Sequence, residues 1–132
     1  MAGNAASLVL AVSGGGRRLL FTGDLAAATE RALVARDGAR LGCDVLKVPH
    51  HGSAGSTSPE LARATAPALA VISAGVRDSY GHPAAAVCAR LAGSGARVLR
   101  TDRDGAVTLS WRAHGPWRLR LPGAPRRLRD DG

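Results

Sequence analysis

The stretch from residue 44 to residue 53, Asp-Val-Leu-Lys-Val-Pro-His-His-Gly-Ser, gives the clearest indication of the fold. Its first five residues are mostly apolar and predict a β-strand, which Pro49 ends because proline cannot donate a ladder hydrogen bond. His50 and His51 follow at once, in a loop that Gly52 makes pliable. Histidine is the commonest metal ligand among side chains, so this loop is a candidate metal or catalytic site.

Two further polar groups follow apolar runs in the same way. Asp24 comes after the run 17–22, and His82 comes shortly after the run 69–73. Each has a simpler explanation by itself: Asp24 suits a helix N-cap, the histidine pair suits an exposed loop, and His82 suits a solvated position before proline. Ligands of open α/β sheets, however, gather beyond the carboxyl ends of the strands. If the three strands are parallel, all these groups converge on one rim.

Apolar runs and helix signals alternate along most of the chain. A glycine turn at 13–16 joins two strands, and Ser58-Pro59-Glu60 is a strong helix start. Asp-Gly at 104–105 predicts a hairpin between strands at 97–101 and 106–111. The order predicts an α/β fold with a mixed β-sheet and about three helices. We expect one domain over residues 1–122 and a basic, disordered tail over 123–132.

Composition narrows the class of protein. The chain has 132 residues and a formal charge of +8, almost all of it from arginine. That charge is weak support for a nucleic-acid partner, because a GC-rich coding sequence also enriches arginine. Cys43 and Cys88 lack metal-ligand spacing and predict unpaired thiols. No apolar run approaches the ~20 residues of a membrane span, and no signal peptide is predicted, so we expect a soluble chain.

The motifs, in this order, resemble the C-terminal metallo-β-lactamase-fold domain of ComEC-type competence proteins, the channel proteins of natural transformation. The resemblance covers about residues 4–112. Its most specific part is the string Lys-Val-Pro-His-His-Gly-Ser at 47–53. The matching segments are Asn4 with Ser7–Val12, Leu19–Asp24, Leu46–Ser53, Ser73–Gly75, Tyr80–Pro83 and Thr101–Gly105.

The resemblance implies a role for each matching polar residue. Asp24 would bridge two divalent metal ions, zinc or manganese, while one of His50 and His51 would bind metal and the other would line the substrate site. Ser53 and His82 would support the ligands or contact phosphate. Asn4 stands where many family members carry a metal-binding histidine, and an amide there would orient rather than bind. The implied activity is a nuclease or phosphodiesterase acting on DNA during uptake.

The family motif His-x-His-x-Asp-His is absent from this sequence. In the family it lies on the first half of a pseudo-symmetric αββα sandwich, so this chain resembles the C-terminal half alone. We therefore expect an incomplete metal site with weak or no activity, and as partners the other half-domain and a membrane channel region. The family context is the cell membrane. Two alternatives remain open: a basic DNA-binding or interaction module without catalysis, and an inactive truncated gene product.

Overall fold

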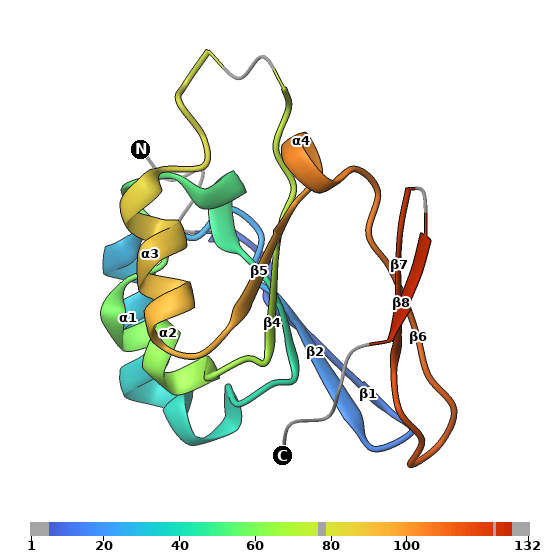
Figure 1. Ribbon diagram of the computed structural model, residues 1–132. Helices are drawn as coiled ribbons and strands as arrows, with labels where there is room; N and C mark the ends of the chain where they lie inside the picture. The colour runs from blue at the N-terminus through green and yellow to red at the C-terminus, as the bar shows by residue number, and fades with distance from the viewer. Residues whose placement is uncertain (1–5, 77–78, 123, 128–132) are drawn as a thin grey trace.

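Two β-sheets face each other, and helices cover the outer face of the larger sheet (Figure 1). This computed structural model describes residues 6–76, 79–122 and 124–127. The layers run from helices through the five-stranded sheet to a small second sheet. The predicted mixed α/β fold is confirmed.

The larger sheet holds five strands, and their spatial order across the sheet is the same as their order in the sequence. They are β1 (Leu10–Gly14), β2 (Arg17–Phe21), β3 (Val45–Lys47), β4 (Leu69–Ile72) and β5 (Arg97–Arg100). The first pair is an antiparallel hairpin, and β2 to β5 are all parallel. The carboxyl ends of β2, β3 and β4 therefore meet at one edge, which is the arrangement that a shared rim requires.

Helices connect the parallel strands. They are α1 (Ala27–Asp37), α2 (Pro59–Thr65) and α3 (Ala85–Gly93), with 3-10 turns η2 (Gly38–Arg40) and η3 (Pro49–Gly52). The helix start predicted near residue 58 is confirmed, because the Ser58 hydroxyl accepts the Leu61 N–H at 3.2 Å. Leu20, Leu46 and Ile72 of the sheet pack with Leu61 and Leu91 of the helices in the main core.

The second sheet packs on the other face of the first. It consists of antiparallel strands β6 (Thr108–Ser110), β7 (Arg118–Leu121) and β8 (Ala124–Arg127). Val45, Leu69, Leu99, Trp117 and Leu119 form the core between the two sheets. The Trp111 indole N–H also donates to the Gly14 carbonyl at 3.0 Å. The second sheet is therefore tied to the β1–β2 turn.

The hairpin predicted around Asp-Gly at 104–105 is wrong. Residues Thr101–Asp104 form a single helical turn, α4, and the strands on either side belong to different sheets. The Asp104 carboxylate accepts the Arg100 N–H at 2.9 Å, which closes this turn, and Gly105 leaves it with a φ of 74°. Side-chain capping of the backbone thus replaces a two-residue hairpin turn here.

Part of the segment that we expect to be a tail forms a strand. Residues 124–127 pair with β7 as strand β8, whereas residue 123 and residues 128–132 lie outside the described part of the chain. Disorder beyond residue 127 stays a prediction. None of the helices in the described ranges is long and apolar enough to traverse a bilayer.

Candidate functional site

The carboxyl edge of the parallel strands brings Asp24 and His51 together. Asp24 follows β2 by three residues, and the η3 turn that carries His51 follows β3. The Asp24 Oδ1 atom lies 4.0 Å from His51 Nε2, and half of each side chain, 51%, is exposed. A carboxylate and an imidazole from separate strands thus face each other at a solvent-accessible rim.

The other ring nitrogen of His51 is held by the next strand. Its Nδ1 atom lies 2.8 Å from the carbonyl oxygen of Ser73, which follows the end of β4. A carbonyl can only accept a hydrogen bond, so Nδ1 carries the proton. In the neutral ring the lone pair is then on Nε2, the atom that faces Asp24. This backbone partner fixes the ring orientation in the way seen for metal-binding histidines.

The histidine loop has an unusual backbone. His50 and His51 have φ values of 49° and 54°, and Gly52 follows with 78°. Left-handed geometry costs a non-glycine residue of order 1–3 kcal/mol, so neighbouring contacts must hold it. The His50 N–H donates to the Gly23 carbonyl and the Ala84 N–H donates to the Gly52 carbonyl, both at 2.9 Å. The loop is therefore fastened to the segments on both sides.

His50 points toward a different neighbour. Its ring lies edge-on to that of His82, with 5.7 Å between ring centroids, and His82 in turn stacks with Tyr80 at 5.9 Å. Pro83 packs so closely on the loop that a Cβ atom at Gly52 would lie 2.6 Å from Pro83 Cβ. The structure thus brings His82 to His50, and Asp24 to His51.

The remaining residues predicted for the site differ in their placement. The Ser53 hydroxyl is half-buried and accepts the Gly55 N–H at 3.3 Å, within its own loop. Asn4 lies outside the described residues. The expectation that Asn4, Ser53 and His82 support the site therefore stays a prediction.

Four further residues shape this edge, and the sequence patterns predict no role for them. The Ser7 hydroxyl accepts the Asp24 N–H at 3.2 Å, Ser73 holds His51, and Thr101 bonds to Ala74 beside Ser73. Burial lowers the pKa of Lys47, and the nearby Asp24 carboxylate opposes that shift. Asp24 therefore has a cationic neighbour as well as His51. Only the motif strings that contain these residues signalled their importance.

The potential metal ligands at this edge are few. Within the described ranges, no group of three or more His, Cys, Asp or Glu side chains could hold a metal ion together. Asp24 and His51 form a pair, and the expected metal chemistry stays a prediction.

This chain is similar to a part of several longer proteins. Competence protein ComA of Neisseria gonorrhoeae and ComE operon protein 3 of Bacillus subtilis are 43% and 42% identical to it over 104 residues, 79% of this chain. Recombination protein 2 of Haemophilus influenzae is 36% identical over 110 residues, 83% of this chain. No family model matches. The chain spans 15% or less of the length of these relatives.

Proposed function

Because this chain is related over 79% of its length to a segment of the competence proteins, we propose that it supplies part of a metal-dependent site for phosphodiester hydrolysis during DNA uptake. The fold would be the second half of a metallo-β-lactamase-like sandwich. The observation that carries the proposal is the approach of Asp24 Oδ1 to His51 Nε2, 4.0 Å apart at the carboxyl edge of the parallel strands.

The geometry of this pair suits a divalent cation. Two ligands of one tetrahedral ion, each about 2.1 Å from it, lie about 3.4 Å apart. Asp24 Oδ1 and His51 Nε2 are 4.0 Å apart, and a small rotation of these two half-exposed side chains would bring them to that distance. Carboxylate oxygen and imidazole nitrogen are ligands that both zinc and manganese accept.

Each residue at the edge then has a distinct task. Asp24 would hold metal, with its backbone fixed by the N–H that it donates to the Ser7 hydroxyl. His51 would present Nε2 because the Ser73 carbonyl occupies Nδ1. His50 and His82 lie beside each other and line the space where a phosphate would bind. When bound, the ions supply Lewis-acid activation of water and charge neutralisation at the phosphate oxygens. Of the two neighbouring histidines, His51 is the proposed ligand.

Two ligands are too few for a working site. Catalytic zinc sites have three protein ligands and structural sites have four. We therefore assign the other ligands to a partner half-domain that carries the His-x-His-x-Asp-His motif. This chain alone would bind metal weakly and hydrolyse little.

An exposed apolar face beside Asp24 supports such a partner. Leu10 and Val12 of β1 are 50% and 46% exposed, and Phe21, opposite Leu10 in the hairpin, is 40% exposed. An apolar hollow of about 320 Å³ continues this face between the two sheets, lined in part by Phe21 and Trp111. Contiguous exposed apolar surface marks interaction sites. Since β2 leads directly to Asp24, a partner covering this face would reach the rim.

Paramagnetic manganese tests the proposed ligands by nuclear magnetic resonance. Mn²⁺ added to the chain should broaden the imidazole signals of His51 first, then those of His50 and His82. His114 serves as an internal control, because it contacts the glycine turn at the other end of the β1–β2 hairpin. The selective broadening should vanish in Asp24→Asn. Equal broadening of the His114 signals, or no effect of the substitution, would contradict the assignment of Asp24 and His51 as metal ligands.

Zinc titration by calorimetry tests whether the site is incomplete. We expect weak binding by this chain, and stronger binding together with phosphodiesterase activity once the half-domain with the histidine motif is added. Tight one-to-one zinc binding by this chain alone would overturn the incomplete-site model.

A further inference from the structure

The outer face of the second sheet is basic and polar. Side chains alternate along its strands, so that Leu109 and Leu119 face the inter-sheet core while their neighbours face solvent. Ser110 pairs in register with Arg118, and Thr108 pairs with Arg120. All four are exposed. We call these four residues, with the exposed Arg112 that follows β6, the arginine face.

The arginines of this face lack acidic partners. In the described part of the chain, no carboxylate pairs with Arg112, Arg118 or Arg120, whereas Arg100 and Arg103 pair with Asp102 and Asp104. The sequence explains this, because no Asp or Glu occurs between Asp104 and Asp130. Over the same stretch arginine stands at positions 112, 118, 120, 126, 127 and 129. The guanidinium groups of Arg112, Arg118 and Arg120 are therefore available to an external anion.

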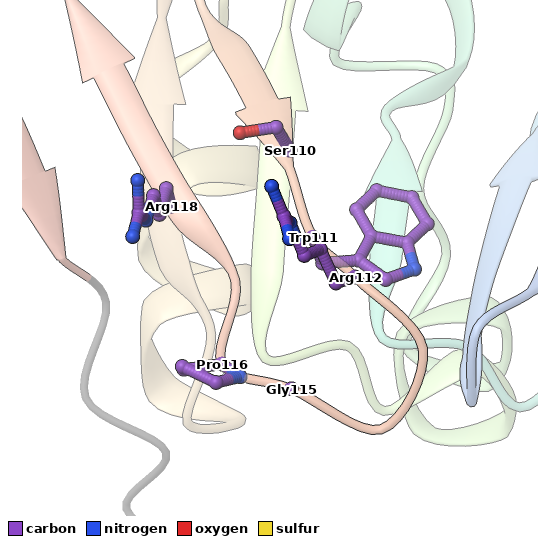
Figure 2. A pocket seen from close by; sticks show the side chains of 6 residues that line it. All are labelled: Ser110, Trp111, Arg112, Gly115, Pro116 and Arg118. Atoms are coloured by element: carbon purple, nitrogen blue, oxygen red, sulfur yellow. The ribbon is translucent and has the colours of Figure 1, made fainter.

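Two hollows lie beside these arginines. One of about 490 Å³ is lined by Ser110, Arg112 and Arg118, together with Trp111, Gly115 and Pro116. A second, of about 430 Å³, is lined by Thr108, Ser110, Arg118, Leu119 and Arg120. Figure 2 shows Arg118 on the strand beside Ser110, while the Trp111 ring is directed away from Arg118. Ser110 and Arg118 line both hollows, so a hydroxyl and a guanidinium donor are shared between them.

From this arrangement we propose that the arginine face binds the phosphate backbone of duplex DNA without reading its sequence. Arg118 and Arg120 are two residues apart on one strand, a spacing of about 6.8 Å. They form a row rather than a cluster, which suits a linear polyanion better than a small anion. Guanidinium and hydroxyl groups are the usual donors to phosphate oxygens.

The aromatic residues favour a duplex over a single strand. Proteins that hold single strands stack the bases on exposed aromatic rings. Trp117 is buried, with Arg17 over its ring at 4.7 Å, and Trp111 donates its indole N–H to Gly14. The Trp117 ring is therefore not available for stacking, and the Trp111 ring is directed away from Arg118 (Figure 2). Backbone contact is thus the mode of binding that this surface provides, and it does not depend on the proposed metal site.

Fluorescence anisotropy with a labelled, mixed-sequence duplex of about 20 base pairs tests the proposal. The measurement uses the full chain, with chelator present to exclude metal chemistry, over a series of salt concentrations. The double variant Arg118→Gln, Arg120→Gln should bind about tenfold or more weakly. The slope of log affinity against log salt should fall by about 1.8, or 0.9 for each lost phosphate contact.

A matched double variant distinguishes the contribution of the arginine face to DNA binding from the contribution of net charge. Arg31→Gln with Arg63→Gln removes the same charge from exposed positions on α1 and α2, on the helical layer. We expect this variant to bind within about twofold of the parent, and Arg118→Lys with Arg120→Lys to retain most binding. Circular dichroism checks that each variant is folded.

Three outcomes would overturn the proposal. Equal losses in the two glutamine variants would show an effect of net charge alone. Stronger binding to a single strand than to the duplex would contradict backbone recognition of duplex DNA. Binding to anionic phosphatidylserine vesicles with none to DNA at low salt would assign the face to a membrane surface.

Discussion

The hydroxyl of Thr101 hydrogen bonds to both main-chain groups of Ala74. It accepts the Ala74 N–H at 2.9 Å and donates to the Ala74 carbonyl at 3.0 Å. Thr101 follows β5 and Ala74 follows β4, so one side chain joins the ends of neighbouring strands. Ser73, the acceptor for His51, comes immediately before Ala74. The position of His51 therefore depends on a residue fifty positions further along the chain.

Replacement of Thr101 by valine should loosen this edge. The change removes two hydrogen bonds at a half-buried position, and we expect the free energy of unfolding to fall by about 1–2 kcal/mol. Urea denaturation measures the loss. Thr108→Val on the exposed face of β6 is the matched control and should change stability by less than about 0.5 kcal/mol. Equal effects of the two substitutions would contradict the role given to Thr101.

Glu30 should be essential to the loop that follows the histidines. Its side chain is fully buried, and its two oxygens accept the N–H groups of Thr57 and Ser58 at 2.6 Å each. Glutamine places an amide N–H against one of these donors, so Glu30→Gln should lower the free energy of unfolding by about 2–4 kcal/mol.

Thermal and urea denaturation measure this effect. Asp37→Asn is the control, because Asp37 pairs with its neighbour Arg36 near the surface and should contribute less than about 1 kcal/mol. A Glu30→Gln protein as stable as the parent would mean that the two short hydrogen bonds add nothing to stability.

Glycine at position 52 should be required. A Cβ atom there would meet Pro83 at 2.6 Å, and the φ of 78° is unfavourable for other residues. Gly52→Ala should therefore cost about 2–4 kcal/mol and shift the imidazole resonances of His50 and His51. Gly55→Ala, in the same loop with no atom closer than 3.9 Å, should be neutral or slightly stabilising. Unchanged imidazole signals in Gly52→Ala would refute the close packing.

Cys43 should be an unreactive thiol. Burial, followed by the charge of Asp44, raises the pKa of Cys43 to about 11. The thiolate is the reactive form, so its population at pH 8 is small and grows as the pH approaches 11. Alkylation at pH 8 should be about a hundredfold slower than in the urea-unfolded chain. Mass spectrometry of the labelled peptides measures both rates, and equal rates would disprove the shift.

Local sequence predicted much of the carboxyl edge. Pro49 and the apolar run before it marked the end of β3, and the Ser58-Pro59 helix start lies where it was expected. The parallel order of β2, β3 and β4 then brings Asp24 to the histidine loop. These features depend on neighbours in the chain and on hydrophobic periodicity, which are visible in a sequence.

The Asp-Gly hairpin failed for a physical reason. A two-residue turn and a side-chain-capped helical turn both tolerate Asp followed by Gly. Which of the two turns forms depends on whether the strands before and after the Asp-Gly pair are hydrogen bonded to each other. Here β5 pairs with β4, while β6 joins a separate sheet with β7. Propensity alone carries no information about those partners.

The sequence by itself determined where the strands end, where glycine allows the chain to turn, and which polar side chains follow the strands. Proline, glycine and apolar runs act on a few adjacent residues, so their effects can be read locally. Only the tertiary structure decided that His51, and not His50, faces Asp24, and that Ser7, Ser73 and Thr101 hold the pair in place. Hydrogen bonds between distant segments arise from the way strands pack, and a linear pattern does not specify them.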